Sequence, residues 1–540
     1  MEAVVEEKEV RSKTQDLDIP DVHLGQYFRS ICERFKDRTA LIDGITDERW
    51  SYAQLLELSS RVAAGLQRLG FRPGQLAGLH CDVTPDIVFA FYGTVLSGGS
   101  MVFAKSSLTE RELIYQFGDS SPCLVFCDEA NADKTKSACA AISSVETLVI
   151  FGERENMVSF AMLKNTPLCE LQPVPSGDPE QLVALIYSSG TTGFPKGVML
   201  SSKNIVASAC IISDPRNRSY DGNDILLGTA PLTHVSGLTM FNATIAVGAC
   251  MVLLPGSEPS ITLPAINKYK ATVMFQFPTY IQKLVKSPLL EKYDISSVRI
   301  LYCGGSSMPS VVVRAVRTKL NIKALKQGYG LTETCGTISL TPSNSEDTES
   351  IGTPLAMTRM KVVDVNTGMK LGPREQGEIR VKGPTCVSGY FNKPEATAKL
   401  YDSEGFLHTG DIGYYTEDGM FYVVDRMKEM IKCMDQQVAP AELEDLLLKH
   451  EDVREVAVTG VPHPEYGEAA RAFVVLSNGH SGSEALKTRL FRLVADQSAP
   501  HKHLHGGLEF VSSIPKSETG KNLRRALRDA FVKKHVQGRI

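Results

Sequence analysis

The pattern of hydrophobic and polar residues divides most of the chain into short apolar runs separated by amphipathic stretches. Apolar runs of the kind that form buried strands occur at residues 76–80, 123–127, 147–151, 272–277 and 298–303. Residues 51–70 repeat leucine and valine at helical spacing and predict a helix. Strands and helices that alternate in this way indicate an α/β fold of layered sheets and helices over residues 21–425.

The pattern changes near Gly377. Residues 378–383 alternate polar and apolar side chains, as a half-buried strand does, and residues 413–425 predict a β-hairpin around an Asp-Gly turn. We therefore expect a smaller β-rich subdomain at about residues 350–425.

Residues 426–540 have the pattern of a small, separate α+β domain. A helix is predicted from Pro440, because proline fits the first helical turn and acidic residues follow it there. Strand-like runs at 453–461 and 470–476 and a helix at 483–496 complete a unit of ordinary domain size.

The ends of the chain and its longest uncharged stretch bear on targeting. Residues 1–20 are rich in Glu, Lys and Asp and lack an apolar segment, so they predict a disordered acidic tail. Residues 225–257 carry no charge but contain prolines and several glycines, which favours a buried helix and strands over a membrane span. Residues 537–540 are not the peroxisomal Ser-Lys-Leu signal, so a cytoplasmic location is the default expectation and a peroxisomal one stays open.

Composition narrows the class of protein further. A chain of 540 residues is too long for one hydrophobic core, so about two to four domains are expected. The net charge of −4 gives no general attraction to nucleic acid or anionic lipid. The twelve cysteines show no C-x-x-C pair and no metal-ligand spacing, which favours free thiols in a reducing compartment.

The most informative segment, residues 187–200, reads Tyr-Ser-Ser-Gly-Thr-Thr-Gly-Phe-Pro-Lys-Gly-Val-Met-Leu. It follows an apolar run and precedes a helical stretch from about Ser201. Glycine N–H groups, hydroxyls and a lysine can together hold a polyphosphate. A P-loop is excluded because its Gly-Lys-Ser/Thr is missing, and a flexible linker is disfavoured by the apolar flanks. The candidate phosphate-binding residues are Ser188, Ser189, Gly190, Thr191, Thr192, Gly193 and Lys196.

A second cluster, residues 327–334, reads Gln-Gly-Tyr-Gly-Leu-Thr-Glu-Thr. Tyr329 can stack on a base, Thr332 can meet a phosphate and Glu333 can hold a divalent ion. The alternative interpretation is a turn with a polar tail. Gln327 and Gly328 complete the nucleotide-binding candidates of this segment.

A third cluster places Asp411 after a Thr-Gly turn, with Arg426 further along the chain. Such a carboxylate can accept hydrogen bonds from ribose hydroxyls, and the arginine can bridge to ribose or phosphate. A surface Asp–Arg ion pair is the alternative.

A fourth segment, residues 515–521, ends in Gly520 and Lys521. A lysine on such a loop is usually solvated. Lys521 is a candidate site residue only because the other three clusters occur in the same chain.

Together these segments closely resemble the ANL adenylating superfamily of acyl-CoA synthetases, beetle luciferases and non-ribosomal adenylation domains. The resemblance covers about residues 38–525, and residues 438–444, Val-Ala-Pro-Ala-Glu-Leu-Glu, are most similar to the branch of 4-coumarate–CoA ligases and luciferases. It implies a large N-terminal domain, residues 21–425, and a small mobile C-terminal domain, residues 426–540. The hinge between them maps by resemblance to Lys428.

The resemblance also implies a two-step ligase reaction. A carboxylic acid reacts with ATP, assisted by Mg²⁺ at Glu333, to give an acyl-adenylate, and coenzyme A then takes the acyl group. Lys521 would bridge the carboxylate and the α-phosphate, while Lys432 and Gln437 match positions of a catalytic loop. The acid pocket is assigned by the same resemblance to His234, Ser236, Gly237, Gly305 and Gly328.

Several alternatives stay open at this level. His234 has the alternative of a buried core histidine, and the small residues 305–307 permit an aryl or a medium-length acyl chain without selecting one. A luciferase-like monooxygenase would adenylate its acid and then oxidise it. A third possibility is a protein that binds ATP and an acid without turnover. Against it, the five charged residues expected to act on ATP and Mg²⁺ are all present: Lys196, Glu333, Asp411, Arg426 and Lys521. Oligomeric state is left open.

One position departs from the family pattern. The family has glycine in the catalytic loop where this chain has Asp435, along the path of the pantetheine arm in the thioester-forming pose. Aspartate is bulkier, disfavours a positive φ and carries the same charge sign as coenzyme A. This substitution predicts intact adenylation with weak thioester formation, or transfer to a different acceptor.

The substitution Asp435→Gly tests this expectation. We expect ATP–pyrophosphate exchange to stay within about twofold and acyl-CoA formation to rise at least tenfold, because only the second step uses the pantetheine path. Both rates are measured on the same preparation with the same acid. Equal and efficient acyl-CoA yield from both proteins would show that the aspartate is harmless.

Overall fold

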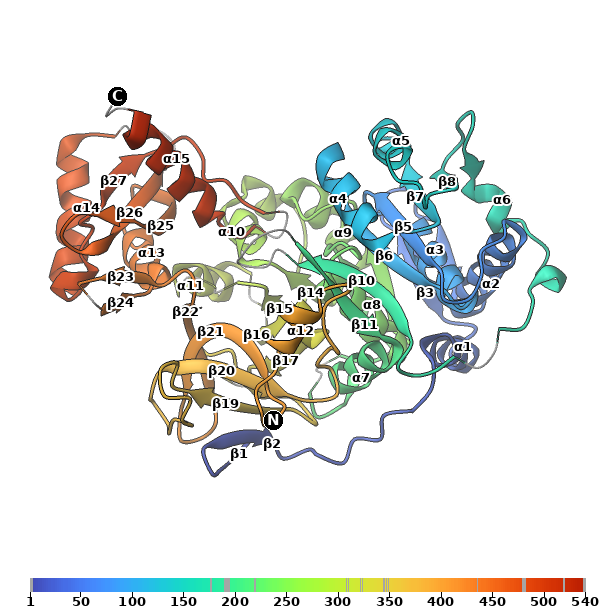
Figure 1. Ribbon diagram of the computed structural model, residues 1–540, viewed down its shortest axis with the longest axis horizontal. Helices are drawn as coiled ribbons and strands as arrows, with labels where there is room; N and C mark the ends of the chain where they lie inside the picture. Colours follow the sequence, from blue (N-terminus) through green and yellow to red (C-terminus); the bar gives the residue numbers. More distant parts are fainter. Residues whose placement is uncertain are drawn as a thin grey trace.

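The computed structural model describes residues 3–174, 177–188, 195–217, 220–306, 308, 310–320, 322, 324–342, 345, 347, 349–434, 436–477, 482–517 and 520–537. The side chains of residues 310, 311, 437 and 535–537 are not described. The fold consists of four β-sheets with helices packed around them (Figure 1). The predicted α/β class and layered arrangement are confirmed.

The largest sheet is mainly parallel and forms the floor of the acid pocket described below. Its six central strands run parallel, and antiparallel strands close both edges. In spatial order the strands are β18 (Thr353–Pro354), β17 (Gly336–Leu340), β16 (Ala324–Leu331), β15 (Ile300–Gly304), β14 (Val273–Gln276), β12 (Ile225–Gly228), β13 (Cys250–Leu253), β3 (Thr39–Asp43) and β4 (Arg49–Ser51).

A second sheet of seven strands carries the two ends of the predicted phosphate-binding loop, Ser188 and Lys196, at one edge. All neighbours in it are parallel except the edge pair β10 and β11. Its order is β11 (Lys196–Ser201), β10 (Leu182–Ser188), β6 (Ser100–Lys105), β5 (Leu76–Cys81), β7 (Leu124–Asp128), β8 (Thr147–Phe151) and β9 (Val158–Ser159). The five strands predicted from apolar runs are therefore confirmed as β5, β7, β8, β14 and β15.

Helices cover these sheets, and the sequence explains where they begin. Ser201 and Asn204 form a reciprocal cap, which starts a helix directly after β11. In contrast, residues 87–95 are buried on all sides because nearly every side chain there is apolar. The helices before the β-rich sheet are α1 (Leu24–Arg34), α2 (Tyr52–Arg68), α3 (Asp86–Leu96), α4 (Glu110–Ser120), α5 (Ala132–Ala140), α6 (Phe160–Lys164), η1 (Leu168–Glu170), α7 (Ser202–Ser213), α8 (Val235–Ala246), α9 (Pro259–Tyr269), α10 (Pro278–Lys286), η2 (Pro288–Lys292), α11 (Ser310–Lys319) and η3 (Thr332–Thr334).

The β-rich part is an antiparallel sheet of six strands, and the short helix α12 (Pro394–Ala398) precedes its last two strands in the sequence. The predicted hairpin is confirmed, and the predicted strand at 378–383 is more buried than half, since only Arg380 and Lys382 of β20 leave the interior. The strand order is β1 (Ala3–Glu6), β2 (Glu9–Ser12), β19 (Arg359–Val363), β20 (Gly377–Lys382), β21 (Leu407–Tyr415) and β22 (Phe421–Arg426).

The first two strands correct the prediction of a disordered acidic tail over residues 1–20. β2 pairs antiparallel with β19 and buries Val10 completely. An otherwise unpaired edge strand offers a row of backbone hydrogen-bonding groups, which the tail satisfies. The acidic character is also neutralised locally, since Glu9 pairs with Arg359 and, at 2.6 Å, with Lys370. Residues 13–20 contain no helix or strand.

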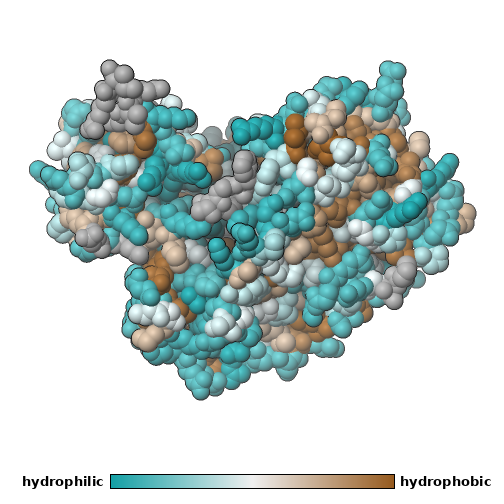
Figure 2. All heavy atoms as spheres, viewed as in Figure 1, coloured by the Kyte–Doolittle hydropathy of each residue, from teal (hydrophilic) through white to brown (hydrophobic). Residues whose placement is uncertain are grey.

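The C-terminal residues form a lobe around a third hydrophobic core. The predicted helix from Pro440, both predicted strands and the predicted helix at 483–496 are confirmed there. The elements are β23 (Ile431–Cys433), β24 (Gln436–Val438), α13 (Pro440–Leu448), β25 (Val453–His463), β26 (Gly467–Leu476), α14 (Glu484–Gln497), η4 (Pro500–Lys502), β27 (Gly507–Phe510) and α15 (Arg524–Gln537). Figure 2 shows this lobe at the upper left, with a hollow between it and the larger body.

Among the described helices, none combines the length and the apolar character that a membrane span requires. All twelve cysteines are free thiols, as their spacing predicts.

The glycine at 352 joins the nine-stranded sheet to the β-rich sheet. Its carbonyl accepts the N–H of Phe421 at 2.9 Å, directly before the strand β18. Its φ is +84°, and a Cβ added here would lie 2.0 Å from the backbone of Leu340. Gly368 has a similar φ of +72° but no atom within 4 Å of an added Cβ.

We expect Gly352→Ala to lower the thermal unfolding midpoint clearly more than Gly368→Ala. Both variants bear the left-handed strain of about 1–2 kcal/mol, while only the first displaces backbone of a neighbouring strand. Differential scanning calorimetry on the full chain measures both midpoints. Equal losses would mean that the sheets are not coupled through this residue.

Candidate active site

The two ends of the predicted phosphate-binding loop lie side by side at the edge of the seven-stranded sheet. Ser188 ends β10 and faces Lys196, which begins β11. The hydroxyl of Ser188 donates to Glu333 Oε1 at 3.0 Å, and the hydroxyl of Tyr390 donates to the same oxygen at 3.1 Å. Lys196 Nζ lies 4.9 Å from the centre of the Tyr390 ring. The fold thus brings a cation, a carboxylate and two hydroxyls into one cluster.

Glu333 has the surroundings that a magnesium ion bound together with a nucleotide requires. It lies in the short helix η3 directly after Thr332, is partly open to solvent, and has two hydroxyl groups beside its carboxylate. Mg²⁺ keeps several water ligands and binds proteins through one or two carboxylates plus substrate phosphates. Within the described residues, no group of three or more His, Cys, Asp or Glu side chains is arranged to hold a metal ion. The residues fit a magnesium ion held jointly by Glu333 and phosphate.

Some predicted residues lie outside the described part of the chain. These are Ser189, Gly190, Thr191, Thr192 and Gly193 of the phosphate-binding loop, and Asp435. The side chain of Gln437 is likewise not described.

The candidate ribose site is a cluster around the buried Asp411 at the junction of β16, β21 and β22. Tyr329 donates from its hydroxyl to Asp411 Oδ2 at 2.6 Å, and Arg426 Nε lies 3.1 Å from Asp411 Oδ1. Asp411 and Arg426 are register partners on adjacent strands, so the hairpin itself sets this pair. Burial raises the pKa of Asp411, against the opposing effects of Arg426 and Tyr329. Arg426 keeps its charge because the neighbouring Asp411 raises its pKa further.

The two residues that precede Tyr329 lie at the same junction. The N–H of Gln327 donates to Thr341 Oγ1 at 2.9 Å and its carbonyl accepts the N–H of Thr341, so strand β16 is fixed here. Gly328 lines the cavity described below.

Lys521 reaches this site from the C-terminal lobe. The loop that carries it docks on α10, where Thr279 Oγ1 donates to the carbonyl of Gly520 at 2.9 Å. The surrounding protein and the charge of Arg426 lower the pKa of Lys521 to about 8, and the residue keeps part of its surface exposed to solvent. Asp411 opposes this shift. Lys521 and Arg426 therefore place two positive charges near one carboxylate.

Lys105 is a further cation at this site that the sequence analysis did not identify. The parallel register pairs Phe103 of β6 with Ile186 of β10, so two residues further on Lys105 lies beside Ser188. Its charge acts on both His234 and Lys521. No motif marks Lys105 in the sequence, and only the strand order places it here.

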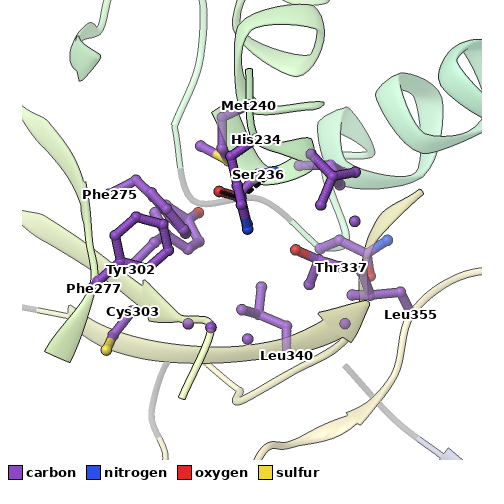
Figure 3. A pocket seen from close by; sticks show the side chains of 18 of the residues that line it. His234, Ser236, Met240, Phe275, Phe277, Tyr302, Cys303, Thr337, Leu340 and Leu355 are labelled. Carbon is purple, nitrogen blue, oxygen red and sulfur yellow. Dashed lines mark hydrogen bonds between the residues drawn. The ribbon is translucent and has the colours of Figure 1, made fainter. Parts of the chain in front are cut away.

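The acid pocket is a mostly apolar cavity of about 740 Å³, including its mouth, between α8 and the nine-stranded sheet (Figure 3). His234, Ser236, Gly305 and Gly328 line it. The apolar lining that the sequence analysis did not name includes Met240, Phe275, Phe277, Tyr302, Leu340 and Leu355.

His234 is held as a neutral imidazole at the cavity wall. Its Nδ1 accepts the N–H of Ser236 at 3.2 Å and the hydroxyl of Ser236 at 2.7 Å, so the ring proton lies on Nε2. Burial and the charge of Lys105 lower the pKa of His234 to about 3. Figure 3 shows the ring entering the cavity from α8.

Gly237 takes a different position. It is absent from the lining of the acid pocket and lines a smaller neighbouring cavity instead. A Cβ added there would lie 2.2 Å from the carbonyl oxygen of Pro231. The close contact of α8 with the preceding turn explains a glycine at this position without any substrate contact.

The remaining catalytic-loop candidate, Lys432, is not brought to this site. Its backbone N–H donates to Glu468 Oε2 at 3.1 Å, and the residue is exposed on β23. Figure 1 places β23 and β24 along the lower side of the lobe, whereas α10, on which the loop of Lys521 docks, lies to the right of the lobe. Met434, two residues further along the chain, has a positive φ of +54°.

The segment that contains Lys428 links β22 to the lobe and is flanked by a cluster of charges. Arg524 contacts Glu444 at 2.8 Å and Asp425 at 3.4 Å and also pairs with Glu429. Asp425 Oδ2 accepts the N–H of Ala441 at 3.0 Å. This cluster, which we call the Arg524 cluster, ties the lobe to the end of β22 in the present orientation.

Comparison with known proteins places this site in a family. The model of the AMP-binding enzyme family matches residues 28–391, and that of the AMP-binding enzyme C-terminal domain matches residues 442–521. The chain belongs to the AMP-binding enzyme family. A 4-coumarate–CoA ligase of Vanilla planifolia is 36% identical over 531 residues, which cover 96% of this chain and 95% of that one. A luciferin 4-monooxygenase of Nipponoluciola cruciata is 34% identical over 525 residues, 94% of each chain.

A solved structure extends the likeness to the fold of AMP-binding enzymes. ATP-bound MatB from Rhodopseudomonas palustris superimposes with a TM-score of 0.85 at 26% identity, over 94% of this chain and 99% of the other. The resemblance deduced from the sequence motifs is therefore confirmed.

The variant Lys521→Ala tests the role of the docked lysine. We expect ATP–pyrophosphate exchange to fall by at least 100-fold, because the positive charge between the two reacting anions is lost. A preformed acyl-adenylate should still react with coenzyme A at a near-normal rate. Lys516→Ala, on the same loop but paired with Glu455 at 2.5 Å, is the matched control. Near-normal exchange in Lys521→Ala would refute the assignment.

Proposed function

We propose that this AMP-binding enzyme is an acid–thiol ligase that activates a carboxylic acid with ATP and transfers the acyl group to coenzyme A. The observation that carries the proposal is the position of Lys521. This lysine comes from the C-terminal lobe, its loop docks on α10 through Thr279, and the charges of Asp411 and Arg426 act on it. Its own charge in turn acts on His234 at the wall of the acid pocket.

In the first step a carboxylate oxygen of the substrate attacks the α-phosphorus of ATP, the bond to the β-phosphate breaks, and pyrophosphate leaves. Lys196 and Ser188 hold the outer phosphates, and Asp411 with Arg426 holds the ribose. Lys521 offsets the negative charge shared by the carboxylate and the α-phosphate. Mg²⁺ held by Glu333 supplies charge neutralisation on the phosphates.

In the second step the sulfur of coenzyme A attacks the acyl carbonyl carbon, and the bond to AMP breaks. The thiol proton leaves to solvent. The lobe that carries Lys521 must then vacate the site, and we assign the hinge to Lys428. Lys432 and Gln437 would enter after this movement, which accounts for the exposed position of Lys432 in the present orientation.

Two specific observations support a second candidate function. A luciferin 4-monooxygenase is as similar to this chain as the ligases are, and Asp435 stands where the family has glycine. The alternative is therefore an enzyme that adenylates its acid and then passes it to oxygen or to an acceptor other than coenzyme A.

The expected partners are small molecules only: a carboxylic acid, ATP and coenzyme A. The net charge of −4 supports no role for nucleic acid, and the twelve free cysteines fit a reducing compartment such as the cytoplasm.

A pyrophosphate-release screen tests the function directly. Aromatic acids and fatty acids of graded length are incubated with ATP and Mg²⁺, with and without coenzyme A. We expect at least one acid to release pyrophosphate above background by at least tenfold and to give AMP and an acyl-CoA when coenzyme A is present. Light emission or another acyl product in place of the thioester would favour the second candidate. Binding of ATP and acid without pyrophosphate from any acid would contradict both.

A further inference from the structure

A buried lysine lies next to two residues that line the acid pocket, Asn217 and Tyr302, and has no part in the proposed chemistry. Lys326 is only 1% exposed. It sits on β16 two residues before Gly328, which corresponds to about 7 Å along a strand, and thus further from the candidate nucleotide site.

The sheet geometry directs Lys326 toward the cavity. Side chains two apart on a strand share a face, so Lys326 lies on the face of Gly328, which lines the cavity. Its register partner on β15 is Tyr302, another lining residue. The Nζ atom lies 6.0 Å from the centre of the Tyr302 ring.

The hydrogen bonds of Lys326 do not balance its charge. Within the described chain its one acceptor is the carbonyl of Asn217, at 3.3 Å, and no carboxylate pairs with it. An ammonium group has three donors, so two remain for other acceptors. Asn217 itself lines the cavity.

A second buried lysine in the same chain shows what a structural role looks like. The side chain of Lys361 is 3% exposed and contacts Asp402 at 2.8 Å and Glu404 at 3.2 Å. Buried charges are ordinarily paired in this way, because an unpaired one costs several kcal/mol of stability. Burial lowers the pKa of Lys326 to about 8, and an acceptor oxygen brought next to it would stabilise the charged form again.

We propose that Lys326 is a specificity-determining residue that binds an oxygen acceptor at the end of the acid substrate remote from the reacting carboxylate. The inference rests on the proposed ligase function. The substrate enters with its reacting carboxylate at the mouth, near His234 and Lys521. Its body lies against Phe275, Met240 and the other apolar side chains, and its far end reaches the ammonium group. The substrate group that Lys326 would bind is a hydroxyl or a second carboxylate, at the position where other acids carry a terminal methyl group or a hydrogen.

The experiment uses acids that differ only at the far end. Two aliphatic series, of six and eight carbons, carry a terminal methyl, hydroxyl or carboxylate. One aromatic series carries hydrogen, hydroxyl or carboxylate at the para position of cinnamic acid. Pyrophosphate release gives kcat and KM for the full-length enzyme and for Lys326→Met, which removes the charge at similar length. Lys326→Arg keeps the charge. Lys319→Met is the control, because Lys319 also donates to a backbone carbonyl, at 3.1 Å, outside the cavity.

We expect the wild type to prefer oxygen-terminated acids by at least tenfold in kcat/KM, mainly through KM. Lys326→Met should abolish or reverse this preference, Lys326→Arg should retain part of it, and Lys319→Met should leave it unchanged. A stronger preference for carboxylate over hydroxyl would identify the acceptor as anionic, and the reverse as neutral.

The proposal fails if the wild type uses acids without the terminal oxygen equally well in all three series, a result that does not require any variant to fold. It also fails if folded Lys326→Met keeps the wild-type preference. Either result leaves the ligase function standing. Absence of pyrophosphate with every acid would instead contradict the ligase function, and the inference with it.

Discussion

Electrostatic repulsion between a carboxylate and a triphosphate is the constraint on which the arrangement of the site depends. Two like charges about 4 Å apart repel by about 4 kcal/mol in protein surroundings of intermediate polarity, before any bond has formed. Cations from separate elements offset this repulsion: Lys196 lies at the edge of one sheet, Arg426 lies on another sheet, and Lys521 comes from the C-terminal lobe. Asp411 pairs with Arg426 and its charge also acts on Lys521, so it limits the repulsion between these two cations.

Because these cations belong to different elements, the contacts between elements position the reaction centre. The backbone bond between Gly352 and Phe421 holds the β-rich sheet on the nine-stranded sheet. The contact of Thr279 with the loop of Lys521 and the Arg524 cluster hold the lobe on both. The Arg524 cluster is buried and carries three carboxylates against one arginine, so it is a contact that movement of the lobe has to rearrange.

Local patterns in the sequence predict much of the fold. Apolar runs give the parallel strands, and the glycine- and hydroxyl-rich segments mark where the nucleotide chemistry lies. The strands β1 and β2 could not be predicted, because their pairing depends on the free edge of β19, far away in the sequence. The acidic residues suggested solvent exposure, yet Glu9 has two basic partners across the sheet.

Site residues that belong to no sequence motif cannot be predicted from local patterns. Lys105 and Tyr390 reach the site only through strand order and a backbone bridge to β11. The family resemblance assigns Gly237 to the acid pocket, but its close contact with Pro231 serves the packing of α8, which only the three-dimensional structure reveals. Motifs therefore identify the reaction class, while the shape of the acid pocket and the position of Lys326 depend on the register of β15 and β16.

The account stands most directly on where a nucleotide binds. A crystal structure of the full chain with ATP and Mg²⁺ should place the ribose on Asp411 and an α-phosphate oxygen within about 3 Å of Lys521 Nζ or of a water that this atom holds. Nucleotide bound elsewhere, or a ribose that leaves Asp411 untouched while Lys521 points to solvent, would contradict the account.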